Sequence, residues 1–80
     1  FIERSEDFGI GELATPKPWV GKSLRTLVVR SKYRVNIIAL RRGGDEHDLE
    51  VAPGADYVLS AGDVVVTLGR NEYIDQLHEL

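Results

Sequence analysis

The chain of 80 residues contains no cysteine and no methionine. Without cysteine it has neither a disulfide framework nor a thiolate metal site. The two histidines, His47 and His78, are too far apart to form a sequence-local metal motif. A domain of this length buries only about 60% of its unfolded surface. Small domains gain further stability from disulfides, metals or oligomerisation. Oligomerisation is the source that remains here.

Long apolar runs and a basic stripe are also missing. The apolar runs are only a few residues long, whereas a membrane helix needs about 20. Charged residues make up 29% of the chain, and the net charge is -3 with both signs interspersed. This composition indicates a globular domain and argues against nucleic acid as a partner. The start, Phe1-Ile2-Glu3-Arg4, carries no initiator methionine and no signal-peptide pattern, so we expect a cytoplasmic piece of a longer protein.

Apolar patterning predicts elements in the order β-α-β-β-β-α. Apolar residues alternate or form short β-branched runs in four predicted strands, residues 8–14, 35–40, 48–52 and 64–69. Leu24, Leu27 and Val28 have the spacing of one helical face, which predicts a helix over residues 24–30. A second helix is expected after Asn71, a predicted N-cap. The pattern predicts a small single domain of the α+β class, with a mixed sheet and two helices.

The most apolar predicted strand contains one polar residue. Residues 35–40 read as a strand buried on both faces, yet the run contains Asn36. A buried asparagine needs hydrogen-bond partners, which a polar ligand or a second copy of the chain would supply. Arg30, Arg34, Arg41 and Arg42 are expected to gather around this strand and the end of the preceding helix. Asn36 and these arginines together indicate a site that recognises a ligand.

Candidate catalytic motifs are incomplete. Gly21-Lys22-Ser23 resembles the end of a phosphate-binding loop, but Lys17 stands where that motif needs a glycine, so Ser23 is better explained as a helix cap. Gly9-Ile10-Gly11 lacks the third glycine of a dinucleotide fingerprint. The acidic run from Asp45 to Asp48 is expected to be a solvated hairpin tip. We therefore expect no enzyme, no catalytic residue, no metal site and no resident cofactor.

Five blocks of residues carry a family resemblance. They are Val20-Gly21-Lys22-Ser23-Leu24, residues 30–42, Pro53, residues 59–66 with their Ala61-Gly62-Asp63 turn, and Gly69. In this order they resemble the TrkA-C domain, the C-terminal RCK domain of potassium-transport gating subunits. The resemblance assigns residues 8–80 to that domain and residues 1–7 to the end of a linker from a preceding domain. Arg34 departs from the pattern, because many relatives have a glycine there.

The resemblance implies a regulatory role and a set of partners. It implies a homodimer that acts on a membrane potassium or cation channel or transporter, at the inner face of the membrane. It also implies a small nucleotide effector, cyclic di-AMP, in the cleft between two copies. A two-fold ligand suits a two-fold cleft, and arginine can bind phosphate. The predicted ligand-binding residues are Leu24, Arg30, Asn36, Ile37 and Pro53. The alternative is a pure dimerisation module of a transporter or gating subunit that has no small-molecule ligand of its own.

Overall fold

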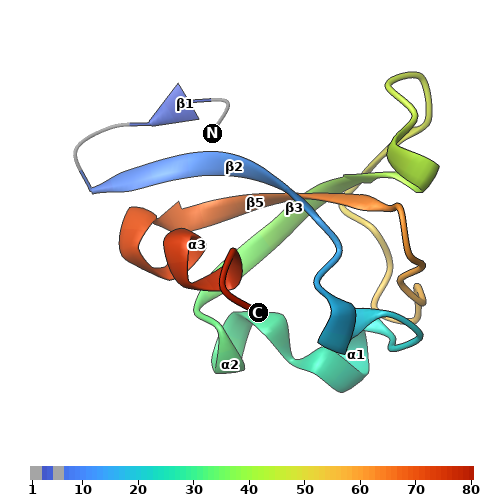
Figure 1. The fold of residues 1–80 in the computed structure, drawn as a ribbon, viewed down its shortest axis with the longest axis horizontal. Coiled ribbons are helices and arrows are strands. Elements are labelled where there is room, and N and C mark those ends of the chain that lie inside the picture. The colour runs from blue at the N-terminus through green and yellow to red at the C-terminus, as the bar shows by residue number, and fades with distance from the viewer. Residues whose placement is uncertain (1–2, 5–6) are drawn as a thin grey trace.

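The computed structural model describes residues 3–4 and 7–80, which form one sheet with helices on one of its faces (Figure 1). The strand order is β1-β2-β5-β3-β4. The strands are β1 (Glu3–Arg4), β2 (Phe8–Ala14), β3 (Val35–Arg41), β4 (Leu49–Val51) and β5 (Val64–Arg70). The helical segments are η1 (Lys17–Trp19), α1 (Leu24–Leu27), α2 (Val29–Lys32), η2 (Arg42–Gly44) and α3 (Asn71–Leu77). No helix in the described part of the chain has the length and apolar character needed to span a membrane.

The structure confirms the α+β class, and from β2 onward the strands and helices follow the predicted order, with the first helix divided into α1 and α2. It corrects the sheet. All strand pairings among the described residues are antiparallel, so the predicted mixed sheet is wrong. The helical segment between β2 and β3 suggested a parallel unit. The two strands do run in the same direction, but β5 lies between them and is antiparallel to both. An arrangement of this kind depends on the last strand inserting between two earlier ones, which local patterning does not report.

The N-terminal residues include a short strand. Residues 1–7 were predicted as the end of a linker, and of these residues 1–2 and 5–6 lie outside the described part of the chain. Residues 3–4 form β1, which pairs with Gly9 and Ile10 of β2. The assignment of these residues to a linker stays a prediction.

The predicted helix over residues 24–30 is broken into two short turns. Val28 lies between α1 and α2 with φ 47° and ψ 48°, in the left-handed region. The predicted cap is confirmed, because Ser23 Oγ accepts a hydrogen bond from the backbone N–H of Thr26. The second predicted cap is wrong, since Arg70 is the N-cap of α3 and Asn71 is the buried first residue of the helix.

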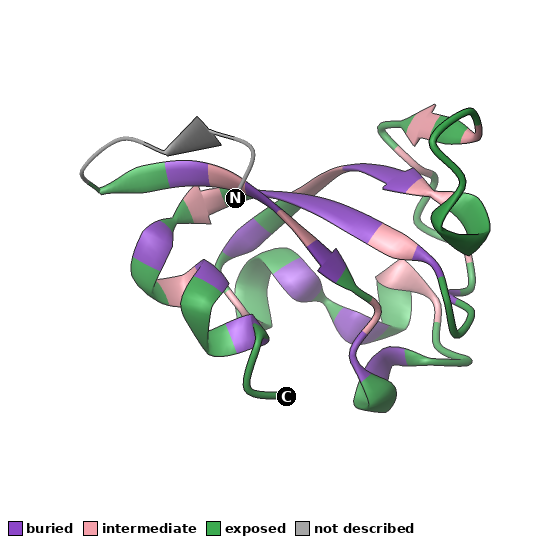
Figure 2. Ribbon diagram, turned by 45° about the horizontal axis from the view of Figure 1, so that its top comes forward, coloured by how far each residue is buried: buried purple, intermediate pink, exposed green. Residues whose placement is uncertain are grey.

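The core lies between the helices and one face of the sheet (Figure 2). Trp19, Val65 and Ile74 are completely buried there. The prediction that β3 is buried on both faces is wrong, because Asn36 is exposed. A β-bulge between Ile37 and Ala39 also shifts the register of β3 against β5. The first half of β3 therefore has an accessible side, and this is where the candidate site lies.

Candidate ligand-binding site

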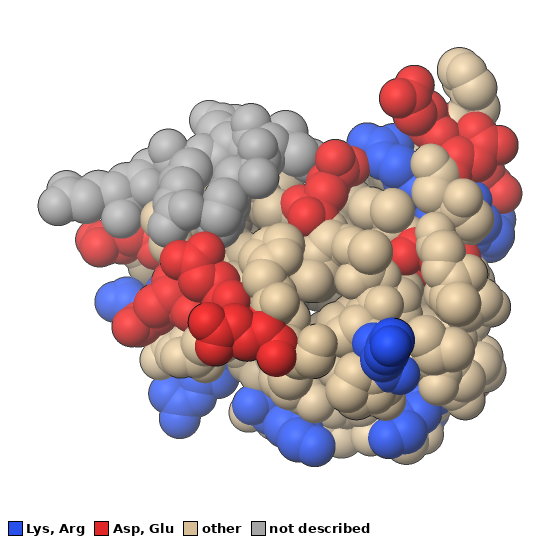
Figure 3. Space-filling model, in the orientation of Figure 1, with Lys and Arg blue, Asp and Glu red and all other residues tan. Residues whose placement is uncertain are grey.

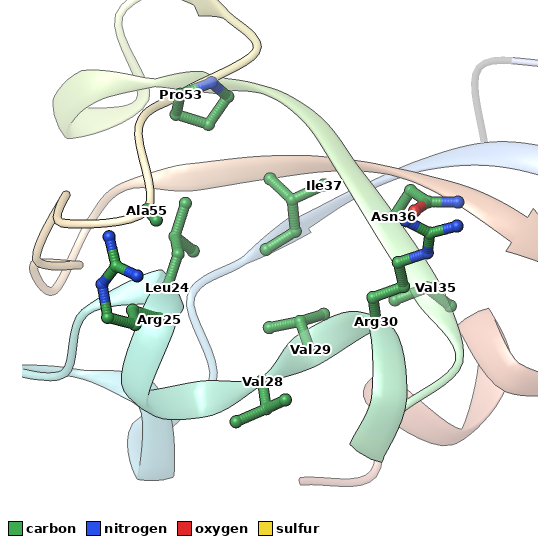
Figure 4. Close-up of a pocket in the computed structure, with 10 residues that line it drawn as sticks. All are labelled: Leu24, Arg25, Val28, Val29, Arg30, Val35, Asn36, Ile37, Pro53 and Ala55. Atoms are coloured by element: carbon green, nitrogen blue, oxygen red, sulfur yellow. The ribbon is translucent and has the colours of Figure 1, made fainter.

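A groove of about 600 Å³ lies between the two short helices and the start of β3 (Figure 4). Its walls come from α1, α2, β3 and the turn that follows β4. The lining residues are Leu24, Arg25, Val28, Val29, Arg30, Val35, Asn36, Ile37, Pro53 and Ala55. All five residues predicted from the sequence to bind a ligand are among them, although they come from four different segments.

The pairing of β3 explains why a groove forms at this place. β4 pairs only with Ala39–Arg41, the second half of β3. Among the described residues, no strand lies beside residues 35–37 on that edge. The helices α1 and α2 and the turn carrying Pro53 lie beside this edge instead. Side chains rather than another strand therefore line the space.

The floor of the groove is apolar. Val29 is buried, Leu24 and Ile37 are half-buried, and Val28 exposes 52% of its surface. A left-handed conformation is costly for a β-branched residue such as Val28. Such strain persists only where surrounding structure fixes it, and it is common at ligand sites. Here it turns the chain between α1 and α2 and leaves an apolar side chain exposed at the edge of the groove.

The ends of the groove carry polar side chains. In Figure 4, Arg30 and Asn36 are drawn at one end, and Arg25 lies at the other. Arg25 Nε is 3.0 Å from Asp56 Oδ1, in an exposed ion pair. Within the described part of the chain, the side chains of Arg30 and Asn36 make no hydrogen bond or ion pair. Because both are exposed to water, they are available to a ligand at no cost in broken internal contacts.

The predicted cluster of four arginines is not formed. Of these four arginines, only Arg30 lines the groove. Arg41 pairs with a carboxylate of β2, and Arg42 pairs with two carboxylates of the β3–β4 hairpin. Arg34 lies over an aromatic ring of α3. The sequence analysis did not name Arg25, which lines the groove from α1 and pairs with Asp56 in the segment after β4.

The acidic hairpin tip behaves as a solvated turn. Asp45, Glu46 and His47 are exposed, as expected. Asp45 Oδ1 accepts a hydrogen bond from the backbone N–H of His47, which stabilises the turn locally. In residues 3–4 and 7–80, no group of three or more His, Asp or Glu side chains is placed to hold a metal ion.

Comparison with known proteins identifies the family. Residues 12–80 match the TrkA-C domain family. The chain belongs to this family. The resemblance drawn from the five sequence blocks is thereby confirmed, and the TrkA-C match covers all four walls of the groove.

Curated relatives of this TrkA-C domain are longer proteins. The chain is 30% identical over 69 residues to the Ktr system potassium uptake protein C of Bacillus subtilis (strain 168), covering 86% of the chain and 30% of that protein. It is 36% identical over 64 residues to the putative transport protein PM1071 of Pasteurella multocida (strain Pm70), covering 80% of the chain and 11% of that protein. The chain thus spans less than a third of either relative.

Solved structures share the TrkA-C fold. One is the RCK C domain of the potassium transport protein KtrA in complex with cyclic di-AMP, at 27% identity and a TM-score of 0.78. That match covers 92% of this chain and 82% of the other. The RCK_C domain dimer of S. agalactiae BusR, also in complex with cyclic di-AMP, matches at 22% identity and a TM-score of 0.73, covering 88% of this chain and 91% of the other. The second likeness shows the fold alone.

Proposed function

We propose that this TrkA-C domain is a ligand-binding regulatory domain of a potassium or other cation transport system. In the proposal it forms a homodimer and binds cyclic di-AMP in the groove, at the interface between two copies. It works in the cytoplasm, at the inner face of the membrane, through its transport partner. The domain binds and does no chemistry, so the proposal includes no catalytic residue, cofactor, metal or nucleic-acid partner.

The observation that carries the proposal is the composition of the groove. Arg30 is an exposed cation without a hydrogen-bond or ion-pair partner among the described residues, and guanidinium groups bind phosphate through charge-assisted hydrogen bonds. Asn36 presents a carboxamide, the group that pairs best with the hydrogen-bonding edge of adenine. The apolar side chains between the two ends, including Leu24, Ile37 and Pro53, suit the faces of a base. The volume lies within the usual range for small-ligand sites, about 300–1,000 Å³.

Charge distribution favours an anionic ligand on this side of the molecule. Figure 3 shows acidic side chains gathered over α3 and at the hairpin tip, while basic side chains lie along the edge formed by α1 and α2. Although the net charge is -3, two arginines, Arg25 and Arg30, line the groove. A field of this sign raises the local concentration of an anion near Arg25 and Arg30.

Two-fold symmetry explains why one groove is not a complete site. Cyclic di-AMP has two equivalent bases and two equivalent phosphates, so two copies of the domain can supply the same contacts to each half. The exposed Val28 gives the groove an apolar border that a second copy would bury. KtrA's RCK C domain, which is 27% identical to this chain, has been solved with cyclic di-AMP bound. We therefore expect one ligand for each dimer.

The transport context rests on the relatives. The chain resembles part of a potassium uptake protein and part of a putative transport protein. A domain of 8.9 kDa that binds a small effector can act on such a system only through the rest of a longer chain or an assembly. We propose that ligand binding at the groove changes the conformation of the dimer, and that the dimer in turn changes the conformation of the transporter.

Light scattering combined with calorimetric titration tests the assembly and the ligand together. We expect a mass near twice 8.9 kDa at micromolar protein and binding of one cyclic di-AMP per two chains. Cyclic di-GMP is the ligand control, because it keeps the two phosphates and changes the base that Asn36 would contact. A dimer that binds no cyclic di-AMP at about 100 μM would leave only the dimerisation module. A monomer at high concentration would overturn both.

A substitution in α2 tests the site. Arg30→Ala should weaken cyclic di-AMP binding at least tenfold, about 1.4 kcal/mol, while the melting temperature without ligand hardly changes. Lys32→Ala is the matched control, because it removes a positive charge from the same short helix at a residue that does not line the groove. If Arg30→Ala lowers the stability without ligand and leaves the affinity intact, Arg30 only supports the end of its helix.

A further inference from the structure

One wall of the groove is a segment outside the sheet. Residues 53–59 follow β4 and precede β5, and they contribute Pro53 and Ala55 to the groove. The N-terminal part of α1 holds this segment through the backbone. The Arg25 N–H donates to the carbonyl of Ala55 over 2.7 Å, and the Leu24 N–H donates to the carbonyl of Tyr57 over 3.0 Å. These bonds hold the segment, and with it Pro53 and Ala55, against the N-terminal part of α1.

A buried carboxylate anchors the other side of the same segment. Asp63 is only 3% exposed, just before β5. Its Oδ2 accepts hydrogen bonds from the Tyr57 hydroxyl and from the Ser60 N–H, each over 2.9 Å. Its Oδ1 accepts a third from the Gly43 N–H, also over 2.9 Å. Asp63 thus joins the groove wall to the turn after β3 and to the start of β5, the central strand of the sheet.

The electrostatics keep this anchor in one protonation state. Burial by itself would raise the pKa of Asp63. The hydrogen bonds from Gly43, Ser60 and Tyr57 lower the pKa by more than burial raises it, so the pKa lies below the ordinary 3.8. Burial and the bond to Asp63 raise the pKa of the Tyr57 hydroxyl above 10.0. At neutral pH the Asp63 carboxyl is therefore ionised and accepts the hydrogen bond, and the Tyr57 hydroxyl is protonated and donates it. The guanidinium of Arg42 lies 5.7 Å from the centre of the Tyr57 ring.

We propose that Tyr57 is a positioning residue of the groove. Its side chain does not line the groove, but its backbone holds α1 and its hydroxyl is fixed to Asp63. The bond between Tyr57 and Asp63 keeps the wall that carries Pro53 and Ala55 at a constant distance from α1. The effect on ligand affinity rests on the proposed function, whereas the effect on the wall does not.

Removing one oxygen atom tests this role. Tyr57→Phe keeps the ring and removes the donor to Asp63. We expect hydrogen exchange of the Leu24 and Arg25 amides to become at least tenfold faster relative to the amides of β5, and cyclic di-AMP affinity to fall severalfold. Tyr73→Phe is the matched control: its hydroxyl accepts a 3.3 Å hydrogen bond from Arg34, away from the groove. This control should change neither the two amides nor the affinity.

The outcomes separate the two proposals. If the wild-type domain binds cyclic di-AMP and Tyr57→Phe changes neither exchange nor affinity, the positioning role is overturned and the proposed function stands. If the wild type binds no ligand but the two amides are released by Tyr57→Phe, the proposed function is overturned and the positioning role stands. Equal acceleration of all amides, including those of β5, would make Tyr57 a general stability residue and overturn the positioning role.

The wild-type domain supplies a measurement that needs no substitution. If the segment is fixed by Asp63, the Leu24 and Arg25 amides should be protected nearly as well as those of β5 and exchange through global unfolding. Exchange as fast as that of the exposed hairpin tip at Glu46 would overturn the positioning role, even if Tyr57→Phe did not fold.

Discussion

Gly69 of β5 lies directly opposite Val35 of β3. A Cβ atom on Gly69 would come within 3.1 Å of Val35 Cγ1 and within 3.4 Å of the carbonyl oxygen of Arg34. Val35 is only 1% exposed and belongs to the core cluster, so it has little room to move. The glycine that forms the last block of the family resemblance is thus explained by close packing of two inner strands.

Gly69→Ala should therefore lower the free energy of unfolding by about 1–3 kcal/mol, the usual range for overpacking. Urea denaturation measures it. Gly54→Ala is the control, because a Cβ on Gly54 would meet no atom within 4 Å. Equal stability of the two variants would show that Val35 can move aside.

Truncations in the two inner strands should differ in cost. Val65 is completely buried, so Val65→Ala should cost about 1–4 kcal/mol. Ile38 is half-buried at the β-bulge, and Ile38→Ala should cost less than Val65→Ala. Thermal unfolding of both variants decides this, and a greater loss at Ile38 would contradict the burial pattern.

Stability should depend on pH through Asp63. Because its pKa is lowered in the folded state, its contribution is complete above the ordinary pKa of 3.8 and is lost as the pH falls through the lowered value. Asp63→Asn should cost about 1.5–3 kcal/mol at neutral pH, as for hydrogen bonds to a charged group. Its stability should then decline less on acidification than that of the wild type.

Asp56→Asn serves as the control for this titration. Asp56 is exposed, and its ion pair with Arg25 is expected to contribute at most about 1 kcal/mol. Chemical denaturation at neutral pH should show a smaller loss of stability for Asp56→Asn than for Asp63→Asn. If the Asp63→Asn curve across the acid range runs parallel to that of the wild type, Asp63 does not carry the pH dependence.

Arg34 permits a test of backbone strain. It has φ 63°, in the region that favours glycine. Arg34→Gly and Arg34→Ala both lose the contact with Tyr73, but only the alanine variant keeps the strain. The glycine variant should be more stable by about 1 kcal/mol. Equal melting temperatures would mean that the chain relaxes at this turn.

The sequence was sufficient for the family and for the order of elements. Period-two and helical spacing of apolar residues are local properties, so β3, β5 and the cap at Ser23 were predicted correctly. The five predicted site residues also lie together in one groove. Their shared location follows from the family pattern, since no local rule connects Leu24 with Pro53. Their role in binding stays a prediction.

Only the tertiary structure decided the features that depend on contacts between distant segments. Insertion of β5 between β2 and β3 makes the sheet antiparallel, which local patterning does not report. The left-handed Val28 breaks a helix that apolar spacing predicted as continuous, and the groove lies beside the two short helices that result. The bond from Tyr57 to Asp63 joins two turns whose polar residues look like ordinary loop residues in the sequence. Local spacing records which face of an element is apolar, whereas the fold decides which elements meet.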